Sequence, residues 1–184
     1  GGALSFSEIN SAAQPFLVAL LAQHFPNRPI VVVTEGLKTQ ESFQQDIGTW
    51  GEVQSLKFKV QSESRTPDAF PATLNLFYPA WEMLPHESKL PHVDVISDRL
   101  ETLVALSNSS ASDHRRSAIV ITSVTALLQK SFPPSEIQKR TRSLKRGDKI
   151  EPLDLIEWLE EQGYEPEAQV SQRGEISLRG GIVD

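Results

Sequence analysis

The sequence has 184 residues, of which 39% are hydrophobic, so it can bury one ordinary core and a smaller second unit. It has no cysteine, which excludes thiolate catalysis and thiolate zinc sites, and its 4 histidines are scattered, so we expect no metal site. A net charge of −6 argues against a surface that binds nucleic acid throughout. The sequence shows neither a bilayer-spanning apolar run nor a basic-then-apolar leader, so we expect a cytosolic protein without membrane contact.

The chain begins with a helix pattern followed by a strand pattern. Residues 15–25 predict an amphipathic helix, because Pro15 suits a first helical turn and apolar residues recur at helical spacing until Pro26. The run IVVVT at 30–34 is continuous and β-branched, which predicts a strand covered on both faces, as in parallel sheets. Such a strand requires helices on each side of its sheet.

Two apolar stripes predict those helices. Thr39, Phe43 and Ile47 step by four along the chain before Gly48, where we expect the helix to end. A second stripe follows Asp94. It consists of Ile96, Leu100, Leu103 and Val104.

Two more apolar runs predict the remaining strands of the sheet. They are LNLFY at 74–78 and AIVIT at 118–122, and a helix pattern at 123–130 follows the second. The polar segment at 107–117 predicts a loop. Alternation of helices with short buried strands predicts a doubly wound, mostly parallel α/β sheet with helices on both faces.

The pattern changes after the double proline at 133–134. A basic connector leads to a helix pattern that begins at Pro152 and stops at Gly163, and alternating residues follow. The inner stripe of this helix consists of Leu153, Ile156 and Leu159. We therefore predict an α/β domain at 1–134 and the start of a small, truncated α+β domain at 135–184.

A glycine-rich phosphate loop is missing from the expected place. Such a loop needs backbone N–H groups, a lysine and a Ser or Thr, yet no lysine precedes Lys38 and the chain contains no Gly-Lys-Ser/Thr sequence. We expect this chain to bind no nucleotide cofactor and to catalyse no nucleotide hydrolysis by itself.

Basic side chains gather in the connector at 139–149. Arg140, Arg142, Lys145 and Arg146 are candidates for contact with nucleic-acid phosphates. The alternative interpretation is a solvated linker, followed by an acidic solvated helix face.

Acidic and histidine side chains also gather between the second strand and the helix that follows it. Glu82, His86, Glu87 and His92 could form an acid/base cluster, but neighbouring prolines and Trp81 favour a structural interpretation. Asp94, Asp98 and Arg99 share one helix. A helix cap and a surface ion pair explain these three more simply than catalysis does.

One long string carries a family resemblance. Residues 78–106, YPAWEMLPHESKLPHVDVISDRLETLVAL, resemble the signature of the amino-terminal module of the bacterial transcription-repair coupling factor. The matching residues are Trp81, Glu82, Leu84, Pro85, Pro91, His92, Asp94, Ile96, Ser97, Arg99 and Leu100. The stretch at 147–184 resembles one that this factor shares with the excision-repair protein UvrB, with its closing Arg-Gly-x-x-x-Asp.

The resemblance implies a fold and a function. It implies a UvrB-like, degenerate RecA-like α/β domain without its nucleotide loop, and a small domain that docks onto the repair protein UvrA in transcription-coupled nucleotide excision repair. The chain would then be the amino-terminal piece of a longer protein, and this piece would end inside its second domain. That protein would contact RNA polymerase and double-stranded DNA through other domains, with ATP and Mg²⁺ in an ATP-driven DNA translocase motor.

The resemblance also assigns partner-binding residues in QRGEISLRGGIVD at 172–184. If the segment is one strand, Ile176 and Leu178 face the core, and Arg173, Glu175, Ser177 and Arg179 face outward. Gly174 is expected to form a turn or bulge, and Gly180 to let another backbone approach closely. Arg179 and Arg173 match arginines of the UvrB motif that binds UvrA. The alternative is that Arg179 is a surface arginine paired with Glu175 or Glu165.

Overall fold

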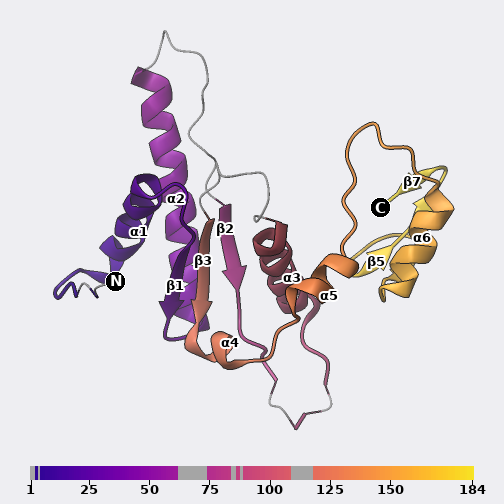
Figure 1. The fold of residues 1–184 in the computed structure, drawn as a ribbon, viewed down its shortest axis with the longest axis horizontal. Helices are drawn as coiled ribbons and strands as arrows, with labels where there is room; N and C mark the ends of the chain where they lie inside the picture. Colours follow the sequence, from indigo (N-terminus) through magenta and orange to yellow (C-terminus); the bar gives the residue numbers. More distant parts are fainter. Residues whose placement is uncertain (1–2, 4, 62–73, 84–85, 88, 109–117) are drawn as a thin grey trace. The chain divides into compact units, whose positions relative to one another are not determined.

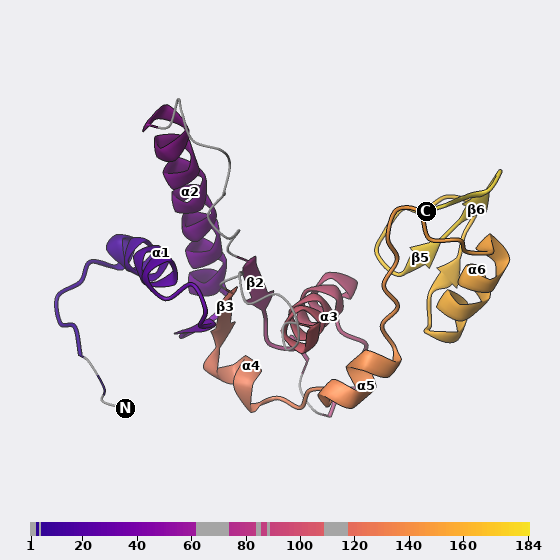
Figure 2. The same ribbon diagram turned by 45° about the horizontal axis from the view of Figure 1, so that its top comes forward.

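The computed structural model describes residues 3, 5–61, 74–83, 86–87, 89–108 and 118–184 (Figures 1 and 2). The chain forms two compact units. Unit 1 comprises Gly1–Trp81 and Asn108–Lys130, and unit 2 comprises Glu82–Ser107 and Ser131–Asp184. The helix at 93–108 therefore makes most of its contacts within unit 2, and the predicted domain boundary near 134 stays a prediction.

Unit 1 is built on a parallel sheet of 3 strands. The strands are β1 (Ile30–Thr34), β2 (Leu74–Tyr78) and β3 (Ala118–Ser123), in the spatial order β1-β3-β2 (Figure 1). β3 pairs in parallel with both neighbours, and all of its residues are buried. The predicted strands and a parallel α/β sheet are confirmed, while the doubly wound, RecA-like arrangement stays a prediction.

Two helices pack on one face of this sheet. They are α1 (Gln14–His24), which follows a short 3₁₀ turn, and α2 (Leu37–Gln61). Their side chains meet those of β3 and β1 in the core. The core consists of Ala22, Phe43, Ile47, Ile119 and Ile121, with Val18, Ile30 and Val32 packed against them.

Two details of unit 1 correct the sequence-based expectations. Val31 and Val33 are 56% and 48% exposed, because only the face of β1 that carries Ile30 and Val32 packs against the core. The predicted cover on both faces of this strand is therefore wrong. Helix α2 also continues through Gly48 to Gln61. A glycine inside a helix costs only about 1 kcal/mol relative to alanine, and the burial of Phe43 and Ile47 of this helix in the core outweighs that cost.

Polar side chains fasten the carboxyl ends of the strands. The Thr34 hydroxyl donates to the Thr122 carbonyl at 3.1 Å, and the Gln40 amide donates to the Ile121 carbonyl at 2.9 Å. After β3 comes α4 (Val124–Leu128), where Gln129 accepts from the Trp81 N–H at 2.6 Å and donates to its carbonyl at 3.2 Å. The Gln129 amide thus bonds both backbone groups of Trp81, as a neighbouring strand would, and fixes the backbone at that residue.

Unit 2 combines helices with very short strands. Its helices are α3 (Val93–Asn108), α5 (Pro134–Lys139) and α6 (Pro152–Glu161). Its strands are β4 (Glu165–Pro166), β5 (Glu175–Ile176), β6 (Leu178–Arg179) and β7 (Ile182–Val183). β4 and β5 pair in parallel, and β6 and β7 pair antiparallel. The predicted α+β composition of the carboxyl-terminal region is therefore confirmed.

Both predicted helix stripes of unit 2 need correction. In α6, Leu153 is 65% exposed, and Leu155 and Trp158 are half-buried beside the predicted Ile156 and Leu159, so the inward face is rotated. In α3, Leu100 is 36% exposed. The most buried side chains of α3 are the polar residues Arg99 and Thr102, which hydropathy alone does not identify.

The end of α6 agrees with the prediction. Gly163 adopts φ +94, its N–H donates to the Glu160 carbonyl at 2.9 Å, and the Tyr164 N–H donates to the Leu159 carbonyl at 3.1 Å. These bonds form a Schellman motif, which needs a left-handed residue and so favours glycine. The predicted polar loop at 107–117 lies mostly outside the described residues.

Candidate partner-binding site

Arg179 lies in a short β-hairpin with a two-residue turn, formed by β6 and β7. Leu178 pairs with Val183 and Arg179 pairs with Ile182, so Gly180 and Gly181 form the turn. Their φ angles are 56° and 85°, and two positive values are what a type I′ hairpin turn requires. A Cβ on Gly180 would meet no atom of this chain within 4 Å, so within the chain the glycine serves the left-handed backbone, and the expected approach of a partner backbone stays a prediction.

The Arg179 side chain is exposed and paired inside the hairpin. Its Nη2 atom donates to Asp184 Oδ2 at 3.0 Å, and the two side chains are 58% and 45% exposed. The ion pair is thus made with Asp184, not with Glu175 or Glu165. Ile182, opposite Arg179 in the hairpin register, is 65% exposed, so an exposed apolar side chain shares a face of the hairpin with Arg179.

Ser177 does not share an outward face with Arg179. It is 3% exposed, and its hydroxyl donates to the Ala168 carbonyl at 3.1 Å. Ile176 is buried as expected, but Leu178 is 36% exposed. The simple alternation fails because β5 pairs with β4 while β6 pairs with β7, so the chain changes sheets at Ser177. The backbone of Ser177 exchanges hydrogen bonds of 3.2 and 3.0 Å with Asp184 at this change.

Glu175 folds back on the turn that precedes it. Its Oε2 atom accepts from the Ser171 N–H at 2.7 Å, from the Ser171 hydroxyl at 2.9 Å and from the Gln172 N–H at 3.1 Å. The backbone and hydroxyl hydrogen bonds of Ser171, helped by Gln172, lower the pKa of the Glu175 carboxyl from its ordinary value of 4.5. Glu175 therefore shapes the turn that carries Arg173.

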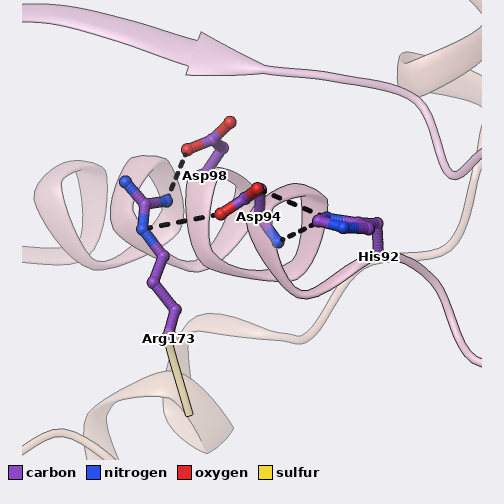
Figure 3. A network of polar contacts seen from close by, with 4 residues as sticks. All are labelled: His92, Asp94, Asp98 and Arg173. Carbon is purple, nitrogen blue, oxygen red and sulfur yellow. Dashed lines mark hydrogen bonds and ion pairs between the residues drawn. The ribbon is translucent and has the colours of Figure 1, made fainter. Parts of the chain in front are cut away.

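Arg173 reaches across to helix α3. Its Nη1 atom donates to Asp98 Oδ1 at 3.1 Å, and its Nε atom lies 3.7 Å from Asp94 Oδ1 (Figure 3). Gly174 adopts φ +94, which confirms the predicted turn, and a Cβ there would lie 3.7 Å from Val93 Cγ2. Arg173 is 53% exposed but is committed to two carboxylates of its own chain.

His92 completes this network at the start of α3. Its Nδ1 atom accepts from the Asp94 N–H at 3.3 Å and lies 3.3 Å from Asp94 Oδ2 (Figure 3). The side chain that accepts the early N–H is thus His92 and not the expected acidic cap. Asp94 lies in the first turn, where a negative charge is favourable to the helix dipole.

The basic connector is exposed but partly engaged. Lys139 pairs with Glu136 at 3.0 Å, and the Arg142 guanidinium lies 5.9 Å from the Trp158 ring centroid. Asp148 accepts from the Lys145 backbone N–H at 2.8 Å. Arg140 and Arg146 are exposed as well, so a run of accessible positive charge exists, and Arg142 makes a cation–π contact with Trp158 of α6.

Metal binding and membrane insertion find no support in the described residues. Among them, no group of three or more His, Asp or Glu residues is placed to hold a metal ion, and the expected lack of a metal site stays a prediction. The helices in this same part of the chain are too short or too polar to cross a membrane.

Comparisons with known proteins point to DNA repair. Residues 143–184 match the family described as the UvrB interaction domain. The transcription-repair-coupling factor of Haemophilus influenzae is 32% identical over 107 residues, which is 58% of this chain and 9% of that protein. The factor of Bacillus subtilis is 28% identical over 177 residues, or 96% of this chain and 13% of that protein. The factor of Escherichia coli is 33% identical over 104 residues, or 56% of this chain and 8% of that protein.

These matches confirm the resemblance to the amino-terminal, UvrB-like module of transcription-repair coupling factors. The chain spans about a tenth of the length of these relatives. The matched domain also contains the hairpin and the Arg173 turn. The sequence indicated both arginines but not their partners. No spacing rule links Arg173 to Asp98, which lies 75 positions away, and none predicts the hairpin register that brings Arg179 to Asp184.

Proposed function

We propose that this chain, a UvrB-like module of the kind found in transcription-repair coupling factors, binds UvrA and so recruits it in transcription-coupled nucleotide excision repair. The match of residues 143–184 to the UvrB interaction domain carries this proposal. The same residues hold an exposed arginine beside the two-glycine turn of a short hairpin, where it is accessible to a partner. Arginine beside apolar area is enriched among the residues that dominate interface energies.

The hairpin supplies both a polar and an apolar contact for a protein partner. Arg179 offers a planar fork of donors for a carboxylate or carbonyl oxygen, and Ile182 offers apolar area that is exposed to water in the free chain. Gly180 and Gly181 add no side chain that would keep a partner backbone away. We place the centre of the UvrA contact on this hairpin.

The module is proposed to be a non-catalytic, degenerate RecA-like scaffold. The parallel sheet and its helices support an α/β scaffold, and the chain contains no Gly-Lys-Ser/Thr sequence for binding a nucleotide phosphate. ATP-driven translocation on double-stranded DNA, with ATP and Mg²⁺, and contact with RNA polymerase are assigned to other parts of a longer, cytoplasmic protein. The small share of each relative that this chain spans is consistent with that division.

The proposal is tested by titrating purified UvrA with this chain and measuring binding by calorimetry or fluorescence anisotropy. We expect saturable binding without DNA or nucleotide added to the chain. A lack of binding at concentrations well above those of ordinary protein complexes would contradict it.

A second function, contact with nucleic acid, has one observation in its favour. The connector at 139–149 exposes Arg140, Lys145 and Arg146 within a short length of chain. The cation–π contact of Arg142 with Trp158 and the net charge of −6 weigh against it, so UvrA binding is the preferred function.

A further inference from the structure

We infer that Asp94 and Asp98 form an intramolecular latch on Arg173, which UvrA must open before it can use that arginine. The inference rests on the proposed function and adds a regulatory contact to it. Arg173 contacts Asp98 at 3.1 Å and Asp94 at 3.7 Å, and all three residues belong to unit 2 (Figure 3).

The latch occupies the donors that a partner would need. A guanidinium binds a carboxylate with two N–H groups on one edge, and it has two such edges. The Nη1 atom of Arg173 donates a hydrogen bond to Asp98 at 3.1 Å, and the Nε atom faces Asp94 at the longer ion-pair distance of 3.7 Å, so an aspartate of α3 already stands at each edge. A partner carboxylate that binds either edge in the two-pronged way must displace one of these aspartates.

The position of the two aspartates on α3 makes them a matched clamp. Asp94 and Asp98 are four residues apart on one helix, so their side chains lie on the same face and repel each other. Arg173 lies between them and relieves that repulsion. Removing Arg173 from the clamp therefore restores a like-charge pair on α3, which adds to the cost of opening.

The latch is also weak enough to open. The side chains of Arg173 and Asp94 are 53% and 60% exposed, so water screens their attraction, while Asp98 is 31% exposed. The hydrogen bonds of Glu175 hold the turn around Arg173 independently of α3. The arginine can thus change partners without unfolding the turn that carries it.

The test compares UvrA affinity among four forms of this chain: wild type, the double variant Asp94→Asn and Asp98→Asn, the variant Arg173→Ala, and the triple variant that combines them. Asparagine keeps the shape of the side chain and removes the charge. We expect the double variant to bind UvrA about two- to fivefold more tightly than wild type, the range that corresponds to exposed ion pairs. In the Arg173→Ala background the same two changes should have no effect on affinity.

Glu101→Gln provides the matched control, since Glu101 is an exposed acid on the same helix and the change removes the same charge. An equal gain in affinity with Glu101→Gln would show general charge repulsion and would overturn the latch. A thermal melt of each variant distinguishes the latch from a purely structural role. If the ion pairs were only structural, their removal would lower the unfolding midpoint without raising the affinity for UvrA, and that result also overturns the latch.

The outcomes also distinguish the latch from the proposed function. If wild type and the double asparagine variant bind UvrA equally, or if Arg173→Ala binds like wild type, the latch is wrong while the proposed function stands. If no form binds UvrA, including the one with the latch removed, the proposed function itself fails and the latch with it.

Discussion

Arg179 Nη2 in strand β6 and Asp184 Oδ2, just after strand β7, lie 3.0 Å apart in a hairpin with a two-residue turn, and both side chains remain about half exposed. Exposed pairs of this kind contribute only about 0 to 1 kcal/mol to folding. The candidate arginine can therefore be removed with little damage to the fold. This separates its role in binding from any role in stability.

Arg179→Ala should weaken UvrA binding at least about fivefold, the loss that marks an important interface side chain, and shift the unfolding free energy by less than about 1 kcal/mol. Titration of UvrA and a thermal melt measure the two effects. Arg146→Ala, another exposed arginine of unit 2, is the control and should leave the affinity nearly unchanged. Equal losses for both variants would remove the hairpin from the interface.

The hydrogen bonds of Glu175 in the turn that carries Arg173 should make the free energy of unfolding fall at acid pH. Its pKa is lowered in the folded chain by the hydrogen bonds from Ser171 and Gln172, so its contribution is present above the ordinary value of 4.5 and is lost as the pH falls through the folded pKa. Wild type should therefore lose more stability between about pH 5 and pH 3 than Glu175→Gln does. Chemical unfolding at several pH values measures this difference, and parallel curves for the two proteins would contradict it.

Two glycines predict stability changes of opposite sign. Gly163 has φ +94 at the end of α6, so Gly163→Ala should destabilise the protein by about 1 to 2 kcal/mol. Gly48 lies inside α2, and a Cβ there meets nothing within 4 Å, so Gly48→Ala should stabilise it by about 0.5 to 1 kcal/mol. Denaturant unfolding followed by circular dichroism measures both changes, and a shared sign would contradict the backbone assignment of one of them.

The sequence predicted those parts of the fold that depend on local composition. The strands at 30–34, 74–78 and 118–122 are runs of apolar, strand-forming residues, and no competing pattern occurs there. The Gly163 stop was also predictable, because the left-handed end of a helix selects glycine. Gly48 misled because the same residue type, inside a helix, carries only a modest energetic penalty.

The candidate site was only half predictable. Both arginines could be selected from the resemblance, but the contact between Arg173 and Asp98 joins residues 75 positions apart, and only the packing of unit 2 brings them together. The burial of Ser177 was missed because side-chain alternation assumes one continuous strand. Two short pairings with different neighbours break that assumption, and sequence alternation does not report which strand pairs with which.

The basic connector yields a prediction that separates the two candidate functions. If Arg140, Lys145 and Arg146 hold phosphates, the affinity for double-stranded DNA should fall with salt by a slope of about −0.9 per phosphate contact on a double logarithmic plot. We expect instead that this chain binds DNA weakly and that the combined change of these three residues to alanine leaves UvrA affinity within about twofold of wild type, because exposed charges away from an interface contribute little. Anisotropy titrations at several salt concentrations measure the slope. A steep slope that these changes abolish, together with intact UvrA binding, would show that the connector is a separate nucleic-acid contact.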